Sequence, residues 1–314
     1  MNKSILFFLF VFPLEIFSQS ANISINRDYY HLIDRYEIMS GRFSQNFHGH
    51  VKPLQRKDVA GFIDSLFAEE SYMKELNSRD LFNLQYLTND NWEWSVSDTS
   101  DNKKPFLKYI YRKKSDFLNV DKGDFDLHVN PVIYFSAGKE SDSDISTYIN
   151  TRGVDLRGSI SKRLGFYSFI STTQAVYPKY VRDWTAQNGV VPNEGFWKKF
   201  KDNGVDYFTA KGYVSFELVK KYVNAQFGFD QSFTGSGHRS FIVSDVSPGF
   251  TYLKFNTKIW RINYTNLFAQ TYADQEFSAT GSLDGKYPKK FLASHHLSIN
   301  ITDNFNLGLF ESVV

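Results

Sequence analysis

Two spacings of hydrophobic residues divide the chain near residue 105. Before it, apolar side chains recur at helical spacing, most clearly at Val59, Phe62, Ile63, Leu66 and Phe67. Ser78 precedes a second helical pattern over 79–88, and a third covers 28–38. These short patterns predict a small helical domain whose apolar stripes pack on one another or on the rest of the chain.

After residue 105, apolar and polar residues alternate, which is the period of a β-strand. In 206–218 one side carries Phe208, Ala210, Gly212, Val214, Phe216 and Leu218, and the other carries Tyr207, Thr209, Lys211, Tyr213, Ser215 and Glu217. The same alternation occurs in 154–161 and onward through 170, in 222–230, in 260–268 and in 293–301. Segments of about ten residues exceed the usual soluble strand of about five or six.

The connections between these strands alternate between short turns and long polar segments. Short turns are predicted at 162–163, 220–221, 257–258 and 303–304, and long loops at 174–204, 231–248 and 273–290. This asymmetry is typical of an antiparallel outer-membrane β-barrel, with its polar face inside and aromatic girdles near the strand ends. A soluble β-sandwich or jelly roll also alternates and stays open as the alternative.

The first 20 residues predict export. Lys3 begins the stretch, apolar residues fill 5–17, and small or polar residues follow at 18–21, as in a secretory signal peptide. A membrane anchor is the weaker alternative, because the stretch is short and Pro13 and Glu15 interrupt it. The predicted organisation is a signal peptide at 1–20, a periplasmic helical domain at 21–104, and an outer-membrane β-barrel at 105–314.

Composition removes several classes of function. The chain has no cysteine, which excludes disulfides, thiol catalysis and cysteine-held metals. Thirty-six Lys and Arg balance 34 Asp and Glu, so the formal charge of +2 is too small for whole-surface nucleic-acid binding. No nucleotide motif occurs, and we expect no cofactor and no nucleic-acid partner.

Several separated blocks carry a family resemblance: Phe227-Gly-Phe-Asp-Gln-Ser-Phe-Thr-Gly-Ser-Gly-His-Arg-Ser240, together with 26–35, 129–133, 151–157, 244–253 and 291–297. They resemble the capsule assembly Wzi family in its Bacteroidetes form, which includes a gliding motility protein. The resemblance implies an outer-membrane β-barrel with a small periplasmic helical domain that assembles or retains capsular polysaccharide. The family barrel has more strands than this sequence offers, and Val314 is not aromatic, so we expect a barrel that is incomplete at its C-terminus.

Aromatic and basic residues of the predicted loop 174–204 form the best candidate glycan site. Aromatic faces stack on sugar rings and cations attract acidic units, so we expect an acidic polysaccharide to bind there. The candidate residues are Tyr180, Arg182, Trp184, Trp197, Lys198 and Lys199, with Arg239 from the next loop. The alternative is an aromatic girdle with solvated lysines.

A glycine-rich segment supplies the second candidate, a structural motif of Gly235, Gly237, His238, Arg239 and Asp245. Arg239 could contact a polysaccharide or the lumen, with Asp245 orienting it. It is not a phosphate loop, because no Lys and Ser or Thr followed by a helix come after the glycines. The alternative is a loop whose glycines adopt positive φ to fold inward or turn tightly.

Nothing in the sequence identifies catalysis or a metal. His295 and His296 fall on opposite sides of a strand, and His48 and His50 lack a third ligand nearby. The leading hypothesis is a non-enzymatic outer-membrane protein that attaches or assembles capsular or exopolysaccharide, in contact with outer-membrane lipid. The alternatives are a part of gliding, adhesion or export machinery, a diffusion porin, and a soluble secreted β-protein.

Overall fold

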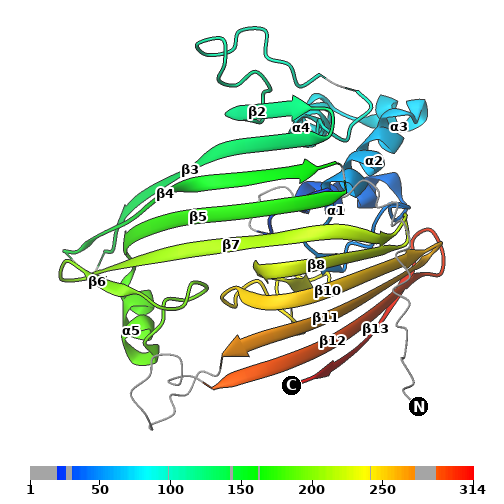
Figure 1. Cartoon of the computed structure of the whole chain (residues 1–314). Helices are drawn as coiled ribbons and strands as arrows, with labels where there is room; N and C mark the ends of the chain where they lie inside the picture. The colour runs from blue at the N-terminus through cyan, green and yellow to red at the C-terminus, as the bar shows by residue number, and fades with distance from the viewer. Residues whose placement is uncertain are drawn as a thin grey trace, which may run out of the picture.

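The computed structural model describes residues 20–25, 30–97, 99–141, 144–161, 163–240, 242–272 and 288–314. The predicted signal peptide lies outside the described residues except for Ser20. Of the described residues, 48% lie in strands and 19% in helices, so the fold is mainly β and its sheet is antiparallel. Figure 1 shows the helices α1 to α4 gathered beside one end of the strands, and α5 beyond the other end.

The described residues from 20 to 117, which precede the large sheet, are called here the N-terminal unit. Its elements are α1 (Tyr30–Ser40), β1 (Val51–Lys52), α2 (Arg56–Phe67), α3 (Glu70–Glu75) and α4 (Ser78–Asp90). The helical spacing predicted for 59–67 is confirmed, because those residues lie in α2. A hydrophobic core joins the helices through Ile33, Tyr36, Val59, Ile63, Leu66, Leu84 and Leu87, each at most 1% exposed.

The start of α4 differs from the prediction by one residue. Asn77, not Ser78, caps the helix: its side-chain oxygen accepts the backbone N–H groups of Arg79 and Asp80 at 2.9 and 3.1 Å. Both residue types cap helices well, so composition alone could not choose between them. No helix among the described residues is long and apolar enough to cross a bilayer.

The large sheet has 11 strands within the described residues. They are β2 (Leu118–Lys122), β3 (Phe125–Lys139), β4 (Ser146–Ile160), β5 (Leu164–Val176), β6 (Lys198–Phe200), β7 (Gly204–Val219), β8 (Val223–Asp230), β10 (Phe250–Ile259), β11 (Ile262–Tyr272), β12 (Lys289–Asn300) and β13 (Asn306–Val313). The order is β13-β12-β11-β10-β8-β7-β5-β4-β3-β2, with β6 paired to β7. Closure into a barrel stays a prediction, because this order is open between β13 and β2.

The short turns lie mostly where the sequence predicts them. The turns at 220–221 and 303–304 are confirmed, and the turn after β4 includes Arg163, with Lys162 outside the described residues. The turn predicted at 257–258 is wrong, as is the strand position predicted for Trp260. Thr257 and Lys258 still pair with β11, and the chain turns at Trp260, where φ is +53°, and Arg261.

Two of the predicted long loops contain regular structure. The segment 174–204 holds the end of β5, α5 (Lys179–Asn188) and β6, so the prediction of a loop there is wrong. The segment 231–248 contains β9 (Phe233–Thr234), which pairs with β1 of the N-terminal unit. The described part of the third, 288–290, includes the start of β12.

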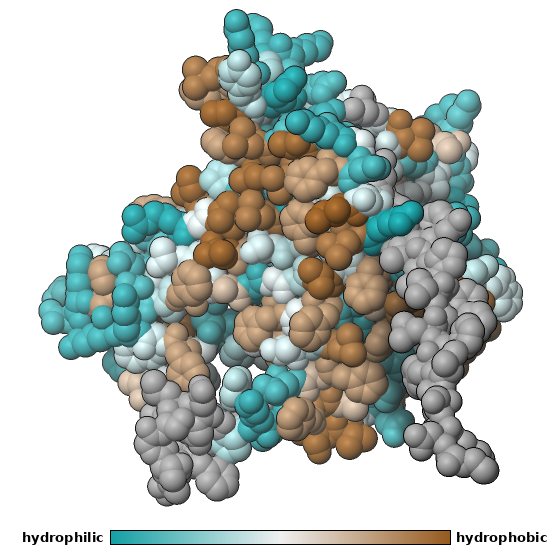
Figure 2. Space-filling view, viewed as in Figure 1, coloured by the Kyte–Doolittle hydropathy of each residue, from teal (hydrophilic) through white to brown (hydrophobic). Residues whose placement is uncertain are grey.

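One face of the large sheet is apolar and exposed. A single row of cross-strand partners is apolar or glycine in all ten strands of the main path: Val120, Leu127, Gly158, Phe166, Val214, Phe227, Leu253, Phe268, Ala293 and Val313. Phe227 is 54% exposed and Phe268 is 43% exposed. Figure 2 shows hydrophobic side chains spread over this face, which we call the outer face.

The opposite, inner face is mainly polar and buried. The neighbouring row of partners reads Asp121, Asp126, Ser159, Gly165, Ser215, Gln226, Lys254, Leu267, Ser294 and Ser312. Ser159, Ser215, Gln226 and Lys254 are between 1% and 8% exposed. The sheet is therefore inverted relative to an ordinary soluble sheet, whose apolar face is the buried one.

Candidate functional site

The polar inner face is buried because the N-terminal unit packs against it. The backbone N–H of Asn22 donates to the Tyr213 hydroxyl at 2.7 Å, and the hydroxyls of Ser24 and Tyr167 are 2.7 Å apart. Tyr167 and Tyr213 stack on each other with ring centroids 5.3 Å apart. These contacts join the start of the described chain to β5 and β7.

A buried charged cluster, called here the Asp116 clamp, fixes the N-terminal unit to β3 and β4. It consists of Trp92, Glu93, Asp116, His128 and Arg157. The Asp116 carboxylate accepts the indole N–H of Trp92 at 2.7 Å, and His128 Nδ1 lies 2.8 Å from the same oxygen. Arg157 pairs with Glu93 and lies 3.4 Å from the second Asp116 oxygen. Asp116 is 0% exposed, so these partners replace water around it.

The pKa of Asp116 reflects this environment. Burial alone would raise it, but the hydrogen bond from His128 and the charge of Arg157 together hold the pKa well below its usual range. The carboxylate is therefore ionised near neutral pH, and its charge faces the guanidinium of Arg157.

A second set of contacts holds the N-terminal unit to β10, to β12 and to the turn before β13. The ammonium of Lys258 donates to the Gln45 carbonyl at 2.5 Å, and the Phe43 N–H donates to the Asp303 carbonyl at 2.6 Å. His48 Nδ1 lies 2.7 Å from the Ser298 hydroxyl. Burial and the charge of Lys258 lower the pKa of His48 to about 4, so His48 is neutral at neutral pH.

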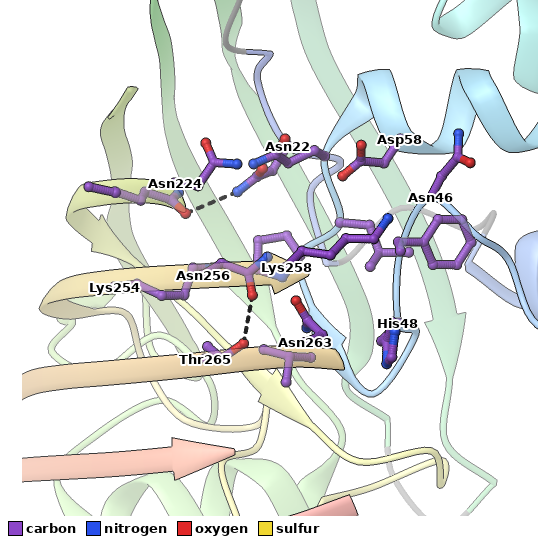
Figure 3. Close-up of a pocket in the computed structure, with 17 residues that line it drawn as sticks. Asn22, Asn46, His48, Asp58, Asn224, Lys254, Asn256, Lys258, Asn263 and Thr265 are labelled. Atoms are coloured by element: carbon purple, nitrogen blue, oxygen red, sulfur yellow. Dashed lines mark hydrogen bonds between the residues drawn. The ribbon is translucent and has the colours of Figure 1, made fainter. Parts of the chain in front are cut away.

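Between α2 and the strands β8, β10 and β11 lies a polar cavity of about 60 Å³ (Figure 3). Asn22 and Asp58 reach it from the N-terminal unit, while Lys254, Lys258 and Asn263 reach it from the sheet. Burial raises the pKa of the half-buried Asp58 carboxyl to about 6. Amide side chains, two lysines and the Asp58 carboxylate thus share the lining with the apolar residues Phe47, Val51, Pro53, Leu54 and Ala225.

The predicted glycan residues Tyr180, Arg182 and Trp184 lie on α5. Tyr180 and Trp184 are one turn apart and are 75% and 42% exposed, so both rings are accessible from solvent. Arg182 turns inward instead: its guanidinium donates to the Tyr177 carbonyl at 2.6 Å and lies 3.5 Å from Glu140. Two of the three residues can therefore reach a ligand without rearrangement.

The other three predicted residues of this region follow α5. Trp197 packs against a buried cluster of Ala175, Val191, Val205 and Tyr207, which gives it a structural role. Lys198 and Lys199 are exposed in β6, and the Lys198 ammonium lies 3.6 Å from Asp206. The lysines remain available to an acidic ligand beside α5.

The segment 235–245 folds toward the N-terminal unit. Gly235 has φ of +139°, its N–H donates to the His50 carbonyl at 2.7 Å, and Ser236 bonds the His50 ring. The inward-folding loop is therefore confirmed at Gly235. A Cβ at Gly237 would lie 3.1 Å from the Arg239 carbonyl oxygen, so the chain bends tightly there as well.

The charged residues of this segment are not brought together. His238 and Arg239 are exposed, and no contact among the described residues joins Arg239 to Asp245 or to α5. Asp245 contributes its backbone carbonyl to Gln231 Nε2 at 3.0 Å. The orienting role predicted for Asp245 therefore has no supporting contact.

The histidines do not form a metal site within the described residues, where no group of three or more potential ligands is close enough. His296 faces inward and His295 bonds Asn266 on the outer side, which confirms that they point to opposite faces. Sequence reasoning missed Asp116, His128 and Lys254 as interior residues. The sequence marks these residues only by their type and position: His128 and Lys254 lie on the polar side of an alternating strand, and Asp116 lies just before one.

No protein-family model, no curated protein and no solved structure matches the chain. The family resemblance therefore stays a prediction from the sequence blocks, and the function is argued below from the geometry.

Proposed function

We propose that this chain is a non-enzymatic outer-membrane protein whose sheet spans the bilayer and whose α5 region binds an acidic polysaccharide at the cell surface. The N-terminal unit, in this proposal, occupies the interior on the periplasmic side. The observation that carries the proposal is the inverted sheet, apolar where it is exposed and polar where it is buried.

The outer face has the chemistry that lipid requires. It contains a shallow apolar groove of about 430 Å³ lined mainly by Phe227, Leu253, Phe268, Phe291 and Val313, which suits acyl chains. In water this apolar surface would stay exposed. A bilayer would bury it, which stabilises the protein by about 25 cal/mol for each Å² of apolar surface. Lipid also requires that every strand edge be paired, so the proposal requires partners for both β2 and β13 in the membrane.

The two ends of the strands support an orientation. Short turns, such as those at 220–221 and 303–304, lie at the end where the N-terminal unit makes its second set of contacts. The long connections, including α5, lie at the other end (Figure 1). Outer-membrane barrels place short turns in the periplasm and long segments outside, so α5 would face the surroundings of the cell.

The filled interior favours attachment over diffusion. The Asp116 clamp and the contacts of Asn22, Ser24 and His48 hold the N-terminal unit against the inner face. A diffusion porin needs an open polar lumen, and these contacts occupy part of it. The proposal therefore predicts little ion conductance in planar bilayers.

The α5 surface offers the two features expected of an acidic-glycan site. Tyr180 and Trp184 present two rings one helical turn apart, and Lys198 and Lys199 add positive charge nearby along the chain. Rings of this kind stack on the faces of sugars, and the lysines attract carboxylates. Trp197 is partly buried against the neighbouring apolar cluster, so we assign it a supporting role.

The test is the partition of surface polysaccharide between cells and medium in a strain that carries Tyr180→Ala with Trp184→Ala. We expect binding on the order of tenfold weaker, and hence shedding of polysaccharide that is still made, because two stacking surfaces are lost. The matched control is Phe82→Ala, which removes an aromatic ring that is 71% exposed on α4.

Each outcome of this test decides between functions. Shedding in the double variant and retention in the control support the α5 surface as the attachment site. Retention in the double variant and in a deletion strain would overturn the attachment function. In that case, motility and adhesion assays of the deletion strain would test the machinery alternative.

A further inference from the structure

The polar cavity of Figure 3 contains several buried hydrogen-bonding groups without a partner in the described part of the chain. Gln226 Nε2, Asn263 Oδ1 and Asn224 Oδ1 all lack one, and Gln226 and Asn263 are each 5% exposed. A buried polar atom without a partner destabilises the folded state, because it has lost its hydrogen bonds to water. Several such atoms around one small cavity indicate that a polar ligand occupies the cavity.

Two of the groups are donors. The Gln226 side chain has a fixed orientation, because its oxygen accepts the Asn22 amide at 3.1 Å, and this leaves Nε2 as an unused donor. Lys254 is 8% exposed, and its ammonium lies 5.9 Å from the centre of the Tyr252 ring and has no hydrogen bond or ion pair among the described residues. The carboxylate of Asp230 attracts the Lys254 ammonium, but the two groups lie farther apart than an ion pair. The donors require an acceptor, and the ammonium favours one that is negative.

The other groups are acceptors. Asn263 Oδ1 and Asn224 Oδ1 come from β11 and β8, on either side of the strand that carries Lys254. Asn256, which also lines the cavity, already accepts the Thr265 hydroxyl at 3.0 Å. An occupant must therefore also donate hydrogen bonds to the amides that remain.

These requirements narrow the chemistry of the occupant. The two lysines outnumber the one Asp58 carboxylate in the lining and disfavour a metal cation, and a simple carboxylate would leave the amide oxygens without donors. A neutral polyol would satisfy the amides and leave the ammonium without a counter-charge. At about 60 Å³ the space accepts only a few non-hydrogen atoms.

We propose that this cavity binds a hydroxylated carboxylate, with the carboxylate on Lys254 and Gln226 and the hydroxyl donating to Asn263. Two sources share this chemistry: a small free hydroxy acid, and the acidic end of a uronic acid whose ring stays outside the cavity. The site is separate from the α5 surface and does not rest on the proposed function, because it stands on the interior contacts alone.

The test is isothermal titration calorimetry of the full chain in detergent with glycolate, acetate and D-glucuronate. We expect glycolate to bind more tightly than acetate, since only glycolate supplies the hydroxyl. Binding of glucuronate in addition would identify the sugar acid as a source, and binding of glycolate alone would identify the small acid.

Variants of the lining residues test whether the measured binding takes place in the cavity. Lys254→Met is expected to weaken glycolate binding by about tenfold or more, because a charge-assisted hydrogen bond is lost. Asn263→Leu, which leaves Lys254 intact, is expected to reduce the preference for glycolate over acetate. Lys211→Met is the matched control: this lysine lies on the inner face of β7 outside the cavity, where it donates to Gln231 at 2.6 Å.

Three results would overturn the proposal. The first is the absence of binding for all three compounds at millimolar concentration, which would mean that water alone satisfies the polar atoms. The second is equal binding of acetate and glycolate. The third is binding that Lys254→Met and Lys211→Met reduce equally, with the folded state of both variants verified by circular dichroism.

Discussion

Replacing Phe227 and Phe268 on the outer face with lysine is expected to prevent stable insertion of the chain into a bilayer. Both side chains belong to the apolar row that crosses the sheet, and β10 lies between their strands. A lysine on the lipid face near the bilayer midplane costs about 2–4 kcal/mol, and two separated substitutions add. The double variant should therefore lose about 4–8 kcal/mol of stability in lipid vesicles, measured by urea titration.

The control for this prediction is the pair Phe227→Leu and Phe268→Leu, which keeps both positions apolar. It should fold into vesicles nearly as well as the parent chain. A loss of less than about 0.5 kcal/mol in the lysine variant would contradict the membrane assignment, because surface substitutions in a soluble protein have effects of that size. The soluble β-protein alternative would then be favoured.

Replacing Asp116 with asparagine is expected to release the N-terminal unit from the inner face. The substitution keeps the shape of the side chain but leaves the buried charge of Arg157 without one of its two carboxylates. Breaking a buried charge cluster by removing one partner costs about 3–5 kcal/mol. Hydrogen exchange of the amides in α2 and α4 should therefore become faster, by an amount that corresponds to this decrease in the free energy of opening.

An exposed ion pair of the same unit provides the control. Asp101 pairs with Lys113 at 2.9 Å and its side chain is 81% exposed, so Asp101→Asn should change stability by at most about 1 kcal/mol. Combining Asp116→Asn with Arg157→Met also takes the ion-pair partner from the buried Glu93 and should therefore increase the loss. Equal effects of Asp116→Asn and Asp101→Asn would contradict the role given to the Asp116 clamp.

The alternation of side chains was enough to predict the strands and to separate their two faces. In 206–218, every second residue is apolar, and the hairpin of β7 and β8 follows directly. Alternation does not tell which face is buried, because a soluble sheet and a membrane sheet have the same period. The burial of Ser215 and Glu217 beneath the N-terminal unit depends on contacts far apart in the sequence.

The helix α5 was missed because few of its ten residues are apolar, and Tyr180 and Trp184 are exposed rather than packed. Its boundaries did have a signal: Pro178 precedes it, and Gly189, with φ of +72°, ends it. The Asp116 clamp could not be predicted, because its members come from the turn after α4, the segment before β2, and two strands. Tertiary contacts of that kind leave no local pattern.

The membrane contact of the outer face is tested most directly with single cysteines, since the chain has none of its own. Spin labels at Phe208→Cys and Phe268→Cys probe the outer face, and labels at Ser215→Cys and Thr265→Cys probe the inner face. In vesicles, we expect the outer labels to be accessible to oxygen dissolved in lipid and shielded from a water-soluble nickel reagent. The inner labels should be shielded from both. Outer labels as accessible to the nickel reagent as those of an exposed loop would contradict the account.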